Sequence, residues 1–129
     1  MGARVLAGGE RRGAFHEPTV VVDVTTDMPV AAQETFGPLA TILRAADETE
    51  AFEIAASTRF GLGLTVCTRD TERALKHAGA VRDGAFFVNQ LVMSDPRLPF
   101  GGTGASGYGR ELSRDGMMEF VNRKTVYVA

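Results

Sequence analysis

The chain has 129 residues, with 14 basic and 16 acidic side chains and a formal net charge of −2. This nearly balanced charge gives no electrostatic basis for binding nucleic acid or an anionic membrane surface. A single cysteine excludes an internal disulfide framework and a zinc site built from several thiolates. No apolar run approaches the roughly 20 residues of a membrane span, and the start shows no signal peptide. We therefore expect a soluble, cytoplasmic chain with no nucleic-acid or membrane partner.

Strands are predicted where β-branched, aromatic and aliphatic residues concentrate. In chain order they are residues 4–7, 19–24, 39–43, 62–68, 84–89 and 124–128. Residues 10–14 predict a polar loop between the first two strands, and residues 27–38 predict an irregular segment. No linker or low-complexity segment divides the chain, so we expect one domain over residues 1–129.

Helices are predicted from Asp47 to the glycines at 61 and 63, from Asp70 to Val81, and near residues 115–121. Asp47 is followed by an acid three residues later, a pattern typical of a helix start, and apolar residues then recur at helical spacing. Between residues 39 and 89 the order is therefore β-α-β-α-β. Helical crossovers of this length predict an α/β fold with a parallel sheet, right-handed connections and flanking helices.

A glycine cluster contains the pattern G-x-G-x-x-G at residues 102–107. In a dinucleotide-binding unit this pattern follows a strand directly and opens a helix. Pro99 lies just before it, and proline is incompatible with a central strand. The context favours a glycine-rich loop, and a free-standing dinucleotide-binding domain is the weakest of the alternatives considered.

Cys67 lies within an apolar strand pattern, where a lone cysteine is usually a small buried residue and not a nucleophile. His16 and His77 have no companion at the spacing of metal ligands, so no metal site is predicted. The residues by themselves indicate a parallel α/β half-domain without a complete catalytic set.

Several motifs follow one another in a specific order. They are Glu34-Thr-Phe-Gly-Pro38, Phe60-Gly-Leu-Gly63, Thr68-Arg-Asp70, Phe87-Val-Asn89, Pro99-Phe-Gly-Gly102 and Ser106-Gly-Tyr-Gly-Arg-Glu111. Together they resemble the C-terminal part of NAD(P)-dependent aldehyde dehydrogenases over nearly the whole chain. The residues 96–102 and 119–124 are most similar to the succinate-semialdehyde dehydrogenase-like branch.

The resemblance implies that Glu34, Phe36 and Leu62 contribute to a site for NAD or NADP in the complete enzyme. The family glutamate that matches Glu34 accepts hydrogen bonds from ribose hydroxyls, a task that suits a carboxylate. The residues that match Phe36 and Leu62 lie beside the nicotinamide ring. Without the resemblance, Glu34 would be interpreted as an acid in a turn, and the two apolar residues as core.

The resemblance also implies a substrate loop at residues 90–98, which contains Ser94 and Arg97 and is followed by Phe100 at the substrate tunnel. Arg97 either pairs with a substrate carboxylate or is a solvated loop arginine. Asn89 is expected to pin the loop. At Gly104 the family usually has lysine, so we expect a loosened loop there.

The family's nucleophilic cysteine, general base and main cofactor domain are not matched in this chain, and Cys67 falls where the family has an apolar residue. The first hypothesis is therefore a C-terminal segment, inactive alone, of an enzyme that oxidises an aldehyde to a carboxylate, with a semialdehyde acid as one candidate substrate. The alternative is a non-catalytic interaction module that pairs with a full-length dehydrogenase. The expected partners are the missing N-terminal region or another subunit, and residues 119–129 are expected to form the tail of a homo-oligomer.

Overall fold

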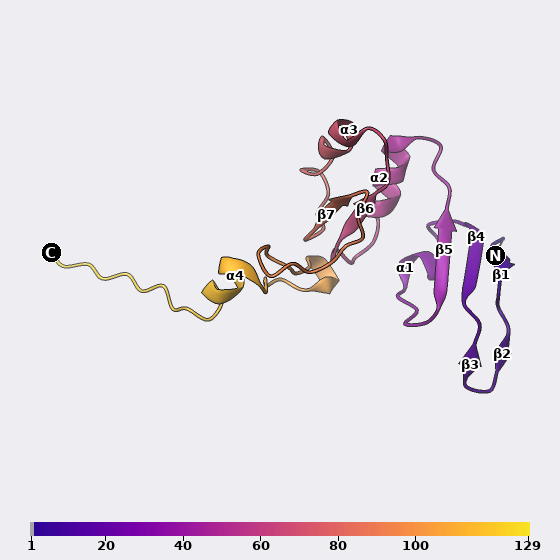
Figure 1. Ribbon diagram of the computed structural model, residues 1–129, viewed down its shortest axis with the longest axis horizontal. Helices are drawn as coiled ribbons and strands as arrows, with labels where there is room; N and C mark the ends of the chain where they lie inside the picture. The colour runs from indigo at the N-terminus through magenta and orange to yellow at the C-terminus, as the bar shows by residue number, and fades with distance from the viewer. Residues whose placement is uncertain (1) are drawn as a thin grey trace. The chain divides into compact units, whose positions relative to one another are not determined.

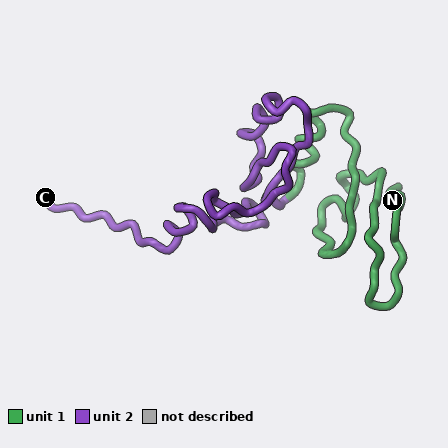
Figure 2. Tube along the Cα trace, in the orientation of Figure 1, with its two compact units in different colours: residues 1–58 green, residues 59–129 purple. Residues whose placement is uncertain are grey.

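The computed structural model describes residues 2–129, which fall into two compact units. The first unit extends to Thr58 and the second begins at Arg59 (Figure 2). Each unit has its own small sheet, and the order of helices and strands can be followed in Figure 1.

The first unit is built on a three-stranded sheet in the order β1-β4-β5. Strand β1 (Arg4–Ala7) runs antiparallel to β4 (Thr19–Val24), and β4 runs parallel to β5 (Leu39–Leu43) (Figure 1). Val22 and Val24 of β4 are buried together with Met28, which follows the strand. The central strand therefore supplies most of this unit's small core.

A hairpin of β2 (Arg11–Arg12) and β3 (Phe15–His16) extends β1 and β4. The prediction of a plain loop at residues 10–14 is therefore wrong in part. Gly13 has a φ of +63° at the first position of the two-residue turn, where glycine is favoured. The side chains of the two short strands are exposed and give the hairpin no buried core. The tight turn at Gly13 brings the two strands together.

Two helices follow in this unit. The short α1 (Pro29–Ala32) interrupts the segment that was predicted to be irregular. Helix α2 (Glu48–Ala56) begins as predicted, because the Asp47 carboxylate accepts a hydrogen bond from the Glu50 backbone N–H at 2.9 Å. The Glu50 carboxylate in turn accepts one from the Ala46 N–H, so the start of the helix is capped from both sides.

The second unit begins with a parallel pair, β6 (Leu64–Val66) and β7 (Phe86–Val88), connected through α3 (Thr71–Leu75). The Asp70 carboxylate accepts from the Arg73 N–H at 2.9 Å, which confirms the predicted helix start. The helix ends earlier than the predicted Val81, and turns occupy the rest of that segment. The parallel direction of β6 and β7 confirms the crossover argument.

The α/β class is confirmed, and each of the two units contains a parallel pair of strands. In the first unit β5 pairs with β4, and in the second β6 pairs with β7. Alternation of strands and helices predicts strand direction, whereas the choice of neighbour depends on which backbone edges meet. Here the earlier strand β4 takes the edge of β5.

The C-terminal region contains the 3-10 turn η1 (Gly104–Ser106) and α4 (Ser113–Met118). The strand predicted at 124–128 is not formed within this chain, since these residues have no ladder partner and Val126, Tyr127 and Val128 are at least 77% exposed. A strand needs a neighbour to satisfy its backbone groups, and no segment within residues 2–129 pairs with these residues. None of the described helices has the length and apolar character that crossing a membrane requires.

Candidate functional site

The glycine-rich loop that follows Gly101 is fastened to the segment that precedes β6. The backbone N–H groups of Thr103 and Ala105 donate to the carbonyls of Gly61 and Arg59, both at 2.9 Å. The Ser106 hydroxyl accepts from the Gly61 N–H at 3.1 Å. These bonds form a short turn without a preceding strand or following helix, which confirms the loop interpretation over a dinucleotide fingerprint.

Gly104 lies at a close approach between this loop and the segment that precedes β6. Its φ is +58°, and a Cβ there would come within 2.5 Å of the Arg59 carbonyl oxygen. Glycine therefore permits a close approach of two backbones. The expectation that Gly104 loosens the loop is wrong, because the absence of a side chain lets the loop dock.

A pocket of about 380 Å³ lies beside this loop. It is lined by Leu62, Phe100, Gly101, Gly102 and residues 106–111. Phe100 is placed by two backbone hydrogen bonds of 2.8 Å with Glu111, and Arg110 Nη1 donates to the carbonyls of Gly102 and Gly109, both at 2.8 Å. The pocket thus brings together one predicted cofactor residue, Leu62, and one predicted substrate residue, Phe100.

Asn89 links the ends of the two parallel strands. Its side-chain amide donates to the Thr68 carbonyl at 2.7 Å and its amide oxygen accepts from the Thr68 N–H at 2.8 Å. The Asn89 backbone has a φ of +55°, a conformation that asparagine tolerates better than most residues. The Asn89 side chain therefore pins the segment after β6, whereas the sequence analysis expected it to pin the loop of residues 90–98.

Cys67 lies directly after β6 and is exposed. The prediction of a buried strand residue is therefore wrong. The strand ends at Val66, because the next ladder position is taken by the Asn89 side chain, which binds Thr68 in place of a backbone partner. Within the described part of the chain, no three His, Cys, Asp or Glu side chains are grouped so that they could hold a metal ion.

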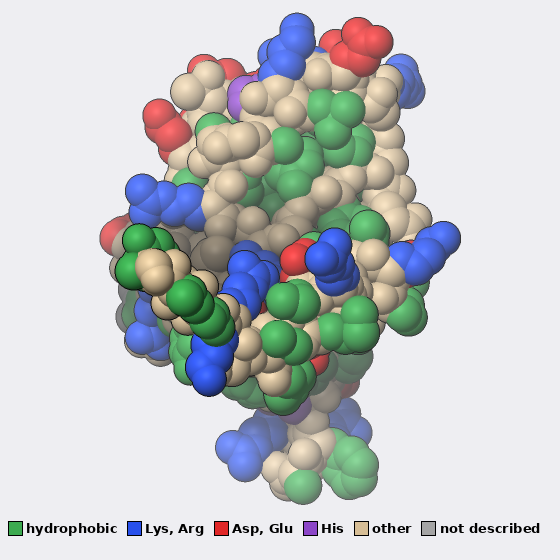
Figure 3. Space-filling view, turned by 90° about the vertical axis from the view of Figure 1, so that its left-hand side faces the viewer, with side chains coloured by type: hydrophobic (Ala, Val, Ile, Leu, Met, Phe, Trp, Pro, Cys, Tyr) green, Lys and Arg blue, Asp and Glu red, His purple; other side chains and the backbone are tan. Residues whose placement is uncertain are grey.

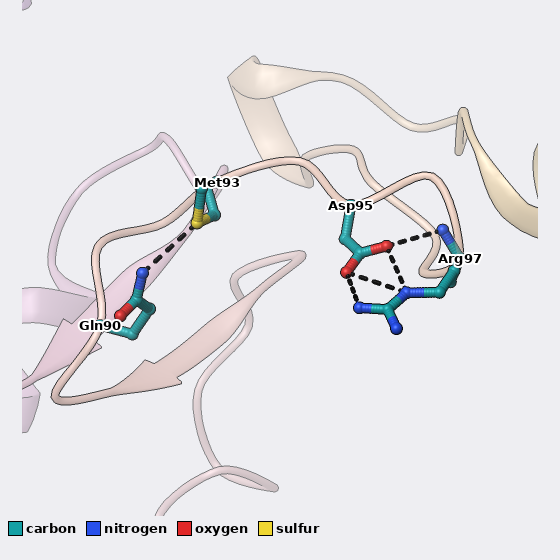
Figure 4. Close-up of polar contacts among 4 residues, drawn as sticks. All are labelled: Gln90, Met93, Asp95 and Arg97. Carbon is teal, nitrogen blue, oxygen red and sulfur yellow. Dashed lines mark hydrogen bonds and ion pairs between the residues drawn. The ribbon is translucent and has the colours of Figure 1, made fainter.

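The loop of residues 90–98 rests on β6 at its beginning. The Thr65 hydroxyl donates to the Gln90 carbonyl at 3.0 Å, and the Gln90 amide contacts the Met93 sulfur at 3.4 Å (Figure 4). Val92 packs over Gly63, where a Cβ would come within 2.7 Å of a Val92 methyl group. The loop therefore leaves the sheet along a defined path.

Arg97 forms a multidentate ion pair with Asp95 (Figure 4). Its Nε donates to Oδ1 at 2.9 Å and to Oδ2 at 3.2 Å, and its Nη2 donates to Oδ2 at 2.6 Å. These hydrogen bonds lower the pKa of Asp95 to about 2 and raise that of Arg97. Sequence reasoning considered Arg97 but missed Asp95, although the Asp-Pro pair at 95–96 is a recognisable turn signal. Ser94, the other predicted substrate residue of this loop, is exposed.

Glu34 and Phe36 lie in the first unit, on the connection between α1 and β5. Glu34 is exposed, and the Phe36 side chain is 91% exposed. Phe36 also has a φ of +45°, which is uncommon for a bulky residue and is found where the surrounding structure or a function demands it. The two predicted cofactor residues of this unit are thus presented to solvent and are not packed as core.

Comparison with known proteins agrees with this architecture. Residues 1–126 match the family model described as the aldehyde dehydrogenase family. The chain belongs to the aldehyde dehydrogenase family.

Within the family, the chain is 46% identical over 131 residues to succinate-semialdehyde dehydrogenase [NADP(+)] 1 of Mycobacterium tuberculosis, covering 99% of this chain and 29% of the relative. A crystal structure of succinic semialdehyde dehydrogenase from Streptococcus pyogenes with NADP+ matches with a TM-score of 0.90 and 41% identity, over 98% of this chain and 29% of that one. A Mycobacterium tuberculosis aldehyde dehydrogenase complexed with NAD+ matches with a TM-score of 0.91 and 35% identity, over 99% and 27%. The chain therefore spans less than a third of the length of these relatives.

Proposed function

We propose that this chain forms the C-terminal segment of a cytoplasmic NAD(P)-dependent aldehyde dehydrogenase that oxidises a carboxylate-bearing aldehyde to the corresponding acid. Similarity to a relative named for succinate semialdehyde supports this substrate class. In this proposal Glu34, Phe36 and Leu62 form one wall of the nicotinamide site. Ser94, Arg97 and Phe100 contribute to the substrate side.

The observation that carries the proposal is the match of residues 1–126 to the aldehyde dehydrogenase family, and the exposure of the two apolar cofactor residues is compatible with it. Phe36 is 91% exposed and Leu62 is 44% exposed. If these side chains were core residues, folding of the chain would bury them, since exposing large apolar surface to water is unfavourable. Other large apolar side chains, such as Phe15 and Tyr108, are exposed as well, and this exposure leaves Phe36 and Leu62 accessible to a ligand or to the remainder of an enzyme.

The chemistry of these residues fits a nicotinamide nucleotide. The Glu34 carboxylate is exposed and accepts hydrogen bonds from two neighbouring hydroxyls at once. Phe36 and Leu62 each offer an exposed apolar surface that excludes water from a ring in contact with it. When bound, the nicotinamide accepts hydride from the substrate carbon.

On the substrate side, Arg97 supplies a charged fork for a carboxylate, and Phe100 provides an apolar wall in the pocket that it lines with Leu62. Oxidation of an aldehyde by this family also needs an activated thiolate nucleophile. In this proposal Cys67 does not take that role, because the resemblance matches it to an apolar position of the family and not to the nucleophile. We therefore propose that the chain by itself does not oxidise aldehydes.

A hybrid enzyme tests this proposal. In it, the present chain replaces the matching 131 residues of the Mycobacterium tuberculosis succinate-semialdehyde dehydrogenase. We expect the hybrid to produce NADPH from succinate semialdehyde, and Glu34→Gln to slow turnover and raise the KM for cofactor, because a neutral amide accepts hydrogen bonds more weakly. Cys67→Ser in the hybrid is the control and should leave both constants unchanged.

Two results would contradict the proposal. The first is robust NAD(P)H production by the present chain alone that Cys67→Ser abolishes. The second is a Glu34→Gln hybrid with wild-type turnover and wild-type cofactor KM, which would reduce Glu34 to an acid in a turn.

A second function is favoured by the exposed apolar tail. Phe120 is 93% exposed, and the tail then runs without a ladder partner to Tyr127 and Val128. We propose that residues 119–129 join the chain to another dehydrogenase subunit, in a homo-oligomer or with a full-length partner. This role is compatible with the first and is tested by sedimentation below.

A further inference from the structure

The turn that carries Arg97 is built around Asp95. The Leu98 N–H donates to the Asp95 carbonyl at 2.9 Å and closes a four-residue turn with Pro96 at its second position. Aspartate at the first position and proline at the second are both favoured in such turns. The Asp95 carboxylate also accepts from the Arg97 backbone N–H at 2.9 Å. The main chain of Arg97 is therefore fixed by the same side chain that binds its guanidinium.

The turn is also tied to the helix that follows it. The Pro96 carbonyl accepts a hydrogen bond of 3.0 Å from the backbone N–H of Ser113, the first residue of α4. Both ends of the loop are thus anchored, by Thr65 to β6 at one end and by Ser113 at the other. The backbone that carries Arg97 is therefore already ordered before any ligand binds.

Asp95 engages one edge of the Arg97 guanidinium. The hydrogen bonds from Nε and Nη2 occupy the side edge of the planar group. Figure 4 shows no dashed line at the third nitrogen, Nη1, and none of the interactions found among the described residues involves it. The end edge, formed by Nη1 and the second hydrogen of Nη2, has the fork geometry that receives a carboxylate through two parallel hydrogen bonds.

The two partners differ in exposure. The Asp95 side chain is 27% exposed, whereas the Arg97 side chain is 86% exposed. The Asp95 carboxylate is therefore the less exposed partner, and the free edge of the Arg97 guanidinium is accessible to a small molecule in solution.

We propose that Asp95 is a positioning residue that holds Arg97 so that its free guanidinium edge receives the carboxylate of the substrate. The inference rests on the proposed function, which assigns Arg97 to the substrate side, and adds the means by which the arginine is oriented. Ordering a long side chain before it binds reduces the conformational entropy lost on binding. The Asp95 carboxylate occupies only the side edge of the guanidinium, so the end edge remains available to the substrate carboxylate.

Binding of succinate to the full chain tests this inference. Succinate carries the carboxylate of the proposed substrate class, and uncharged succinamide is the matched ligand control. In ¹⁵N-labelled protein we expect succinate to shift the Arg97 Nε–H resonance in a saturable way and succinamide to leave it unchanged. We expect Asp95→Asn to raise the Kd for succinate about fivefold, because the guanidinium is no longer pre-oriented.

Glu10→Gln is the matched control variant. Glu10 also binds an arginine two residues away, with its carboxylate 2.9 Å from Arg12 Nη2, but it lies in the first unit, outside the substrate loop. Its Kd for succinate should equal that of the wild type. A Kd that is unchanged or lower in Asp95→Asn would overturn the positioning role, and a lower value would identify Asp95 as a competitor.

Arg97→Gln separates the inference from the function on which it rests. If this variant binds succinate as the wild type does, or if the wild type does not bind, the carboxylate role proposed for Arg97 fails and the inference fails with it. If Arg97→Gln loses binding while Asp95→Asn does not weaken it, only the positioning role fails.

In the hybrid enzyme, Asp95→Asn is tested by comparing its effect on the KM for a charged aldehyde with its effect on kcat and on the KM for a neutral aldehyde. Asp95→Asn should raise the KM for succinate semialdehyde and leave kcat and the KM for propanal, a neutral aldehyde, unchanged. A variant that raises both KM values equally would show a general structural effect and would overturn the positioning role.

Discussion

The loop of residues 99–111 and the tail of residues 119–129 both have little regular secondary structure, but they differ in how they meet the rest of the chain. The loop is fastened at Thr103 and Ala105 by backbone bonds to the segment before β6. The tail has exposed Phe120 and Tyr127 and no ladder partner in the chain.

The difference follows from side-chain size. The glycines of the loop allow backbones to approach until their donors and acceptors meet, as at Gly101, where a Cβ would come within 2.4 Å of the Gly109 carbonyl oxygen. The large apolar side chains of the tail gain stability only against another apolar surface. Whether an irregular segment is held in one position therefore depends on the contacts that its backbone and side chains can make, and not on its secondary-structure class.

The largest expected effect comes from breaking the close approach at Gly84. A Cβ at this position would lie 1.7 Å from the Gly101 carbonyl oxygen and 2.8 Å from its carbon, both backbone atoms that cannot rotate away. We expect Gly84→Ala to lower the free energy of unfolding of the second unit by about 3 kcal/mol or more. Urea unfolding followed by circular dichroism measures this change.

Gly79→Ala is the matched control, because a Cβ there meets nothing within 4 Å. It should change the free energy of unfolding by less than about 0.5 kcal/mol. Equal effects of the two substitutions would show that the glycine-rich loop is not docked as described.

A smaller loss is expected at Asn89. Asn89→Ala removes both side-chain hydrogen bonds to Thr68 and places alanine at a φ of +55°, so we expect a loss of about 2 kcal/mol in the free energy of unfolding. Asn89→Asp keeps the acceptor and loses the donor, and should fall between alanine and the wild type. Hydrogen exchange of the Thr68 amide reports the bond directly, and unchanged protection in Asn89→Ala would refute the pinning role.

The tail should show the opposite behaviour, with little effect on folding and a clear effect on association. Deleting residues 124–129 should change the free energy of unfolding by less than about 0.5 kcal/mol, because these residues have no ladder partner in the chain. It should weaken self-association, measured by sedimentation velocity at matched micromolar concentrations. Val126→Pro should act in the same direction because it removes one backbone donor, and Val126→Thr, which keeps that donor, is the control. A stable monomer of the intact chain would exclude the proposed tail contact.

The smallest effect concerns pH and the turn at Asp95. Because the hydrogen bonds from Arg97 hold the Asp95 pKa at about 2, the ion pair favours the folded turn above the ordinary pKa of 3.8 and is lost as pH falls through about 2. A ¹³C titration of the Asp95 carboxyl should therefore have its midpoint near 2, and Arg97→Gln should move it upward. An ordinary midpoint in the wild type would show that the pair does not persist in solution.

Several elements were predictable from the sequence because their causes are local. Asp47 and Asp70 cap the helices that follow them, and the β-branched run 19–24 forms β4. The helical crossover between β6 and β7 determined that they are parallel. The ordered motifs predicted the family, which the comparison confirmed over residues 1–126.

The site was predictable in part. The motifs singled out Leu62 and Phe100 separately, and the fold places both on one pocket. The motifs also selected Arg97, while its partner Asp95 was missed because a family motif does not show which neighbouring side chain an arginine will bind. The assignment of Glu34, Phe36 and Ser94 stays a prediction until the hybrid is measured.

Other features were decided only by contacts between segments distant in the sequence. The pairing of β5 with β4 depends on which edges meet, and the end of β6 at Val66 depends on the Asn89 side chain that binds the Thr68 backbone. The docking of Gly104 depends on the Arg59 carbonyl, 45 residues earlier in the chain, and the contact of Gly61 with Ser106 also joins residues 45 apart. Capping, strand propensity and strand direction arise within a few residues, whereas these features arise where two backbones come close enough to exchange hydrogen bonds, and that proximity is set by the fold as a whole.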